Sequence, residues 1–211
     1  QKDYREAFGR LATGQSPDTL FIACSDSRVV PNTFASTNPG DLFVLRNVGN
    51  LIPPCDKQGH SLSDESEGAA IEFSVLSLQV SDIIVCGHSE CGAMRALAED
   101  RKKVNTPNLK SWLRHGDKAA EQQRSGLAPD MSLAKHNQLS QLNVLHQIEN
   151  IKSYPAVKQR INNKTLGIHG WWFDIAKADV YAYDEELNRF ILIDDNGSKK
   201  LIQRLEKARP T

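Results

Sequence analysis

The chain has 211 residues, of which 39% are hydrophobic and 25% charged, so its composition excludes a disordered segment. It carries 26 basic and 26 acidic side chains, and no apolar run approaches the roughly 18 residues of a membrane span. We therefore expect neither a nucleic-acid partner nor a membrane partner. We expect a single domain over residues 1–211, located in the cytoplasm because the start of the sequence shows no signal-peptide pattern.

Short apolar runs alternate with helical patterns along the chain, which is typical of an α/β fold with a mostly parallel sheet between layers of helices. The helical pattern at 65–80 has apolar residues on several faces, which indicates burial or a subunit interface. In chain order we expect strands at 19–23 and 42–46, a helix at 65–80, a strand at 83–86, helices from residue 92 and at 109–123, 133–151 and 156–162, strands at 166–172, 180–183 and 190–193, and a closing helix at 199–207.

Metal-binding side chains follow the first and third of these strands. Cys24 comes directly after the apolar run at 19–23, and His88 and Cys91 follow the apolar run at 83–86. Ligands of parallel α/β sheets bind at the carboxyl ends of the strands, so these three residues meet in one crevice if the two strands are neighbours.

The residue types of this group favour zinc. Thiolate and imidazole are preferred zinc ligands, and three protein ligands with one open position are typical of a catalytic zinc site. Magnesium prefers oxygen ligands and would be poorly served by two thiolates. Each short motif alone is weak evidence for a metal site. His88 and Cys91 are equally consistent with a helix-capping histidine beside a small buried cysteine. Asp26 and Arg28 are equally consistent with an ion pair in a solvated turn.

Taken together, the motifs resemble those of the β-class carbonic anhydrases, and the resemblance covers nearly the whole chain. It is carried by the runs Ala23–Val29 and Gly87–Gly92, and also by Pro39–Val44, Arg46–Asn50, Gly68–Glu72 and His169–Trp171.

This resemblance implies one Zn²⁺ per chain, held by Cys24, His88 and Cys91. It also implies a four-stranded parallel sheet with an added edge strand, and self-association as homodimers or homotetramers whose pockets draw on two subunits. The implied reaction is the reversible hydration of carbon dioxide to bicarbonate and a proton, with zinc-bound hydroxide as the nucleophile. In this scheme Asp26 orients the hydroxide, and Arg28 keeps Asp26 ionised and away from the metal.

The substrate pocket implied by the resemblance is that of the plant-like, open-site subgroup. Gln15 matches a residue that donates a hydrogen bond to substrate, while Phe43, Phe73 and Val48 would form an apolar wall. Phe73 departs from the pattern, because a tyrosine is usual there. The other subgroup uses a Trp, an Arg and a Tyr to bind bicarbonate away from zinc. The equivalent positions in this chain are Phe21, Arg46 and Phe173.

Two other functions stay open at this point. The same zinc site would suit hydrolysis of carbonyl sulfide or carbon disulfide. The second open function is that of a structural or regulatory zinc protein, in which Asp26 is the fourth zinc ligand and no water is activated. Outside the motifs we expect a core position for Cys86, a packing role for Trp112, and surface positions for Glu90, His115 and His136.

Overall fold

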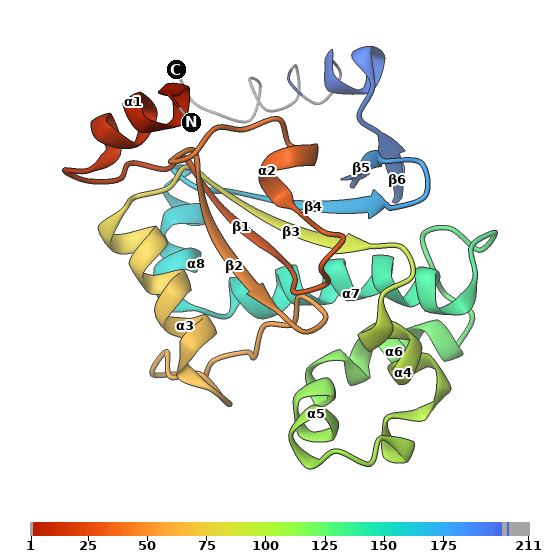
Figure 1. Ribbon diagram of the computed structural model, residues 1–211. Coiled ribbons are helices and arrows are strands. Elements are labelled where there is room, and N and C mark those ends of the chain that lie inside the picture. Colours follow the sequence, from red (N-terminus) through yellow and green to blue (C-terminus); the bar gives the residue numbers. More distant parts are fainter. Residues whose placement is uncertain (1, 200–201, 203–211) are drawn as a thin grey trace.

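The chain folds around a six-stranded sheet with the strand order β2-β1-β3-β4-β5-β6. The computed structural model in Figure 1 describes residues 2–199 and residue 202. The first four strands in that order are parallel, and β5 and β6 are antiparallel. The strands are β1 (Thr19–Cys24), β2 (Leu42–Asn47), β3 (Asp82–His88), β4 (Gly167–Asp174), β5 (Asp179–Asp184) and β6 (Arg189–Leu192).

The expected parallel core is confirmed, and the antiparallel edge of the sheet has one strand more than the resemblance implied. Two antiparallel strands follow β4, where the resemblance implied one edge strand. The connections 175–178 and 185–188 are short loops that join antiparallel neighbours, whereas a parallel pair needs a crossover of a dozen or more residues.

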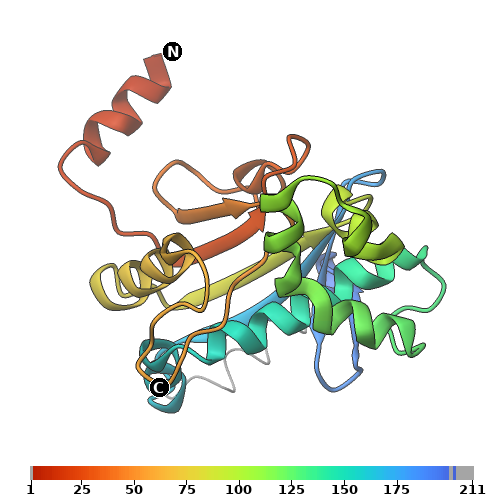
Figure 2. The ribbon, with the colours of Figure 1, turned by 90° about the horizontal axis from the view of Figure 1, so that it is seen from below.

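Helices pack against both faces of the sheet and give three layers. Figure 1 shows α7 and α8 along one face and α2 on the other, and Figure 2 shows α1 standing clear of the sheet. No sequence pattern had indicated α1. The helices are α1 (Lys2–Leu11), α2 (Pro31–Phe34), α3 (Glu65–Glu72), α4 (Gly92–Asp100), α5 (Pro107–Trp112), α6 (Asp117–Arg124), α7 (Lys135–Lys152) and α8 (Pro155–Asn162), with single turns η1 (Phe73–Ser77), η2 (Arg101–Lys103) and η3 (Leu113–Gly116).

The expected helix at 65–80 is shorter and changes type. After α3 it continues as the π-helical turn η1, in which the Leu78 amide donates to the Phe73 carbonyl (3.0 Å). Gln79 then takes a left-handed conformation (φ 56°), which ends the helix. Phe73 and Leu76 project from the turn with 46% and 55% of their surface exposed.

Two other expected helices also differ. The helix expected at 109–123 is divided into α5, η3 and α6. The division falls at Gly116, where a Cβ would lie 2.6 Å from the Leu97 side chain. The closing helix expected at 199–207 falls almost wholly outside the described residues.

Burial on both faces explains why β1 reads as a continuous apolar run. Leu20 and Ile22 face the cluster that includes Val144 of α7, while Phe21 and Ala23 face the opposite cluster. Within the part of the chain that the structure describes, no helix combines the length and the apolar character that crossing a bilayer requires.

Candidate metal centre

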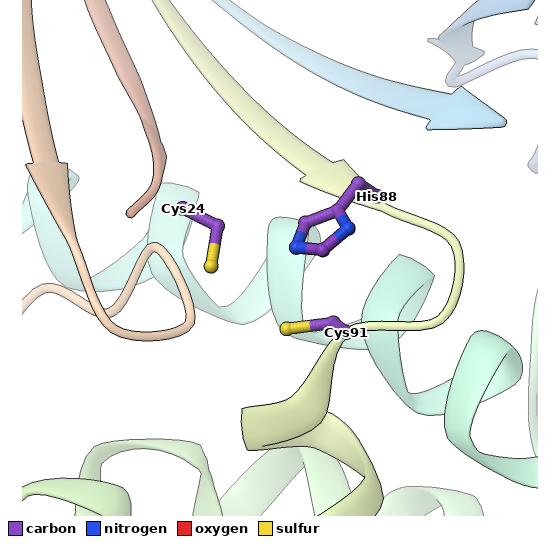
Figure 3. A group of neighbouring side chains, drawn as sticks. All are labelled: Cys24, His88 and Cys91. Carbon is purple, nitrogen blue, oxygen red and sulfur yellow. The ribbon is translucent and has the colours of Figure 1, made fainter. Parts of the chain in front are cut away.

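The ends of β1 and β3 bring the three expected metal ligands together. These strands are neighbours, so Cys24 and His88 lie at the same edge of the sheet. A short turn then returns the chain to Cys91, the N-cap residue of α4. Figure 3 shows the two thiols and the imidazole pointing toward a common centre. The group lies where the connections after β1 and β3 diverge, which is where the sequence predicted it (Figure 1).

The geometry of this group fits a metal ion. The two Sγ atoms and an imidazole nitrogen lie within 4.8 Å of one another, and all three residues are buried. The Nδ1 atom of His88 lies 2.8 Å from the Ser89 carbonyl, which can only accept, so Nδ1 carries the proton. The buried Nε2 atom therefore has a free lone pair, and no described group donates a hydrogen bond to it. A soft, tetrahedral cation such as zinc matches this set of donors.

Without a cation, the two thiols compete for a proton. The pKa of Cys24 is lowered to about 4, chiefly because the Cys91 thiol hydrogen-bonds to it, with a contribution from the Gly49 amide. The pKa of Cys91 is raised, because its thiol is the donor in that pair and is also buried. A metal ion would replace the shared proton, because thiolate is the form that binds metal.

Asp26 and Arg28 form a bidentate ion pair beside the ligands. Arg28 Nε donates to Asp26 Oδ1 (2.9 Å), and Nη2 donates to Oδ2 (2.7 Å). This pairing with Arg28 holds the pKa of Asp26 well below its usual range, so the carboxylate stays ionised. Its Oδ2 atom lies 4.0 Å from His88 Nε2, so the carboxylate borders the metal-binding group.

Arg46 holds the strand end that carries these groups. Its guanidinium donates to the carbonyls of Cys24 (3.0 Å) and Asp26 (2.8 Å). Both contacts go to backbone oxygens of the segment between the first ligand and the Asp26 carboxylate. Arg46 therefore fixes the path of the chain through the site.

The loop after β2 packs closely against α4 because it contains a glycine, and the same loop contacts Cys24. Gly49 has φ +83°, and a Cβ there would lie 2.9 Å from the Ala93 side chain. Its amide reaches Cys24 Sγ at 3.4 Å. Val48, in the same loop, is 45% exposed, and its carbonyl accepts from Trp112 Nε1 (2.8 Å). Trp112 therefore anchors this loop by a hydrogen bond, whereas the sequence had indicated only a packing role for it.

The remaining expected pocket residues lie elsewhere in the chain. Phe43 and Phe73 contact each other, with ring centroids 5.8 Å apart, and Gln15 is exposed before β1. Phe43 precedes Asn47, the register partner of Cys24, by four residues, or roughly 13 Å along the strand. One chain therefore does not bring these three residues to its own metal-binding group.

Aromatic rings occupy the positions at which the other subgroup has polar groups. Phe173 stacks on Phe34 with centroids 4.5 Å apart, and Phe21 packs edge-on against Phe34 and Trp171 at 5.9 Å each. Phe21 and Phe173 belong to one buried apolar cluster. Neither residue offers a hydrogen-bond donor from its side chain.

The structure also decides the surroundings of four residues outside the motifs. Cys86 is fully buried, as expected. His115 is partly buried rather than on the surface, and burial lowers its pKa to about 4. Glu90 is exposed, as expected, but His136 is half-buried, and its Nε2 atom lies 2.9 Å from Glu90 Oε1 next to the ligand segment. No local sequence pattern indicates this contact, because the two residues are 46 positions apart.

Comparison with known proteins agrees with this geometry. Residues 19–180 match the sequence model of the carbonic anhydrase family. The chain is 38% identical to a carbonic anhydrase of a Synechocystis strain over 89% of this chain and 67% of the relative. It superposes on the β-carbonic anhydrase CcaA with a TM-score of 0.82 at 37% identity, covering 90% and 91% of the two chains.

A second solved structure, from the fungus Sordaria macrospora, is described as one of two tetrameric β-carbonic anhydrases. It matches with a TM-score of 0.71 at 31% identity, over 86% of this chain and 88% of that one. A family match over most of the chain, relatives above 30% identity and a shared fold lead to one conclusion. The chain belongs to the carbonic anhydrase family, as an enzyme of its β class.

Proposed function

We propose that the chain catalyses the zinc-dependent, reversible hydration of carbon dioxide to bicarbonate and a proton. The observation that carries this proposal is the buried convergence of Cys24, His88 and Cys91 beside the Asp26–Arg28 pair. These three residues would hold one zinc ion per chain. When bound, zinc lowers the pKa of a coordinated water, so that a nucleophile is available near neutral pH.

Asp26 and Arg28 supply the orientation that the reaction needs. The ionised Asp26 carboxylate can accept a hydrogen bond from the attacking oxygen and so direct its lone pair toward the carbon of carbon dioxide. Arg28 occupies both carboxylate oxygens, and this grip opposes a swing of Asp26 into the metal-binding group. The pair therefore favours an open site over one in which Asp26 is a fourth ligand.

We further propose that the working enzyme is a homodimer or a larger assembly. Gln15, Phe43 and Phe73 lie too far from the ligands of their own chain, but they would complete the pocket of a second copy. Phe73 and the neighbouring Leu76 expose apolar surface, which supports burial of this region against another chain. In such a pocket, Gln15 would donate a hydrogen bond to the developing bicarbonate, and Val48, Phe43 and Phe73 would form the apolar wall.

We also propose that the chain lacks the bicarbonate switch of the other subgroup. Bicarbonate at that position would contact the phenyl rings of Phe21 and Phe173, which donate no hydrogen bonds. The nearby Arg46 already donates to two backbone carbonyls. Bicarbonate would therefore gain little there to offset breaking the Asp26–Arg28 pair.

Stopped-flow measurement of carbon dioxide hydration tests the function. We expect rapid turnover by the zinc-loaded protein and none after chelation. We expect the Arg28→Ala variant to lose most of the rate while it retains zinc. Full zinc content without hydration by the wild-type protein would indicate a structural site. Faster turnover of carbonyl sulfide than of carbon dioxide would assign the other substrate.

A further inference from the structure

Glu90 lies between two metal ligands and has a strained backbone. It follows His88 by two residues and precedes Cys91, and its φ of +56° is in the left-handed region, which is unfavourable for a residue with a side chain. Such a conformation persists only when the surrounding structure holds it in place.

Contacts from two helices fix this residue. Asn137, in the first turn of α7, holds it twice: Oδ1 accepts from the Glu90 amide (2.8 Å), and Nδ2 donates to Glu90 Oε1 (3.1 Å). His136 contacts the same carboxylate oxygen at 2.9 Å, and Arg95 of α4 pairs with the other oxygen. The Glu90 carboxylate is 47% exposed, whereas Asn137 is nearly buried, so Asn137 is the better-fixed partner.

The position of Glu90 matters because its carbonyl binds Arg28. Arg28 Nη2 donates to the Glu90 carbonyl at 3.1 Å and to Asp26 Oδ2 at 2.7 Å. Arg28 is 48% exposed and receives little support from packing, so these hydrogen bonds determine where its guanidinium lies. A shift of the Glu90 carbonyl would move Arg28, and Asp26 would follow.

We propose that Asn137 is a positioning residue for the reaction. It acts through Glu90 and Arg28 on the orientation of Asp26. The inference rests on the proposed role of Asp26 and Arg28, which it extends to the start of α7. Asn137 touches neither the metal ligands nor the substrate in this scheme, so its removal is expected to leave zinc binding intact.

The Asn137→Ala variant tests this role by carbon dioxide hydration and by zinc content. Both contacts to Glu90 are lost, and we expect kcat/KM to fall about tenfold, since small misplacements of catalytic groups cost up to about 10²-fold. The zinc content should remain at one ion per chain. Asn150→Ala is the matched control, because Asn150 also lies on α7 and donates to a backbone carbonyl, that of Ile52 (2.8 Å). It should keep the wild-type rate.

A double-mutant cycle with Arg28→Ala separates positioning from a general structural effect. If Asn137 acts through Arg28, Asn137→Ala should reduce kcat/KM about tenfold in the wild-type background and hardly at all in the Arg28→Ala background. An equal reduction in both backgrounds would overturn this inference and leave the proposed function standing. A wild-type rate for Arg28→Ala itself would overturn the proposed roles of Asp26 and Arg28, and this inference with them.

A second pair of variants keeps the test decisive if Asn137→Ala folds poorly. Asn137→Asp keeps the acceptor for the Glu90 amide but places a carboxylate against a carboxylate, so we expect a lower kcat/KM. Adding Glu90→Gln restores a donor and an acceptor across the contact, and the rate should return toward wild type. Failure of the double variant to recover any of the lost rate would contradict the assignment.

Discussion

Replacing Gly49 by alanine is the sharpest test of how the loop after β2 supports the metal centre. An alanine at φ +83° costs about 1–2 kcal/mol, because L residues disfavour the left-handed region. Its Cβ would also lie 2.9 Å from Ala93 Cβ and 3.2 Å from the Met94 side chain, and overpacking of this kind costs about 1–3 kcal/mol. We therefore expect Gly49→Ala to reduce the free energy of unfolding by about 2–5 kcal/mol.

The same substitution should weaken metal binding. To relieve the contacts, the loop must move away from α4, and the Gly49 amide would then leave Cys24 Sγ, now 3.4 Å away. Urea unfolding at fixed protein and zinc concentrations measures the stability. Competition with a chelator measures the zinc affinity, which we expect to be lower in the variant.

Gly92→Ala is the matched control for this prediction. Gly92 opens α4, has no positive φ, and has no atom within 4 Å of the position of an added Cβ. Alanine is the better helix former, so we expect unchanged or slightly higher stability. A stability for Gly49→Ala within about 0.5 kcal/mol of wild type would show that the loop relaxes freely, and would refute the reasoning from its close approach.

The remaining predictions concern the ligands, the assembly and pH. Metal analysis should show that Cys24→Ala and Cys91→Ala lose most of their zinc; near-full occupancy in either would contradict the ligand assignment. Leu76→Arg should shift sedimentation toward the monomer, while Leu127→Arg, at an equally exposed leucine outside η1, should not. His115 has a lowered pKa of about 4, so the unfolded state binds its proton first as pH falls below 6.5. Stability should therefore drop by about 1–2 kcal/mol between pH 6.5 and 4, and the drop should be smaller in His115→Gln.

The sequence by itself determined the local chemistry of this protein. The apolar runs predicted all six strands to within a few residues. The signal is most continuous in β1 and β3, because strands buried on both faces need continuous apolar sequence. The placement of Cys24 after one such run, and of His88 and Cys91 after another, predicted the metal-binding group. Asp26 and Arg28 are two residues apart in one turn, so the sequence could already indicate their ion pair, although Glu90, whose carbonyl also holds Arg28, comes from a distant segment.

Only the tertiary structure decided how these groups are supported. Glu90 and Asn137 are 47 residues apart, and Val48 and Trp112 are 64 apart, so no local pattern links them. The helix expected at 109–123 is divided at Gly116, a poor helix former, where the Leu97 side chain of α4 also packs closely.

The placement of the pocket residues was also a matter of tertiary structure. The resemblance named Gln15, Phe43 and Phe73 as pocket residues and implied pockets drawn from two subunits, and strand direction puts these residues toward the end of the sheet opposite the ligands of their own chain. Each residue in a strand adds about 3.3 Å, so a few positions carry a side chain out of reach of the metal-binding group. The residue types could thus be read from the sequence, but which of them share one site depended on the path of the folded chain.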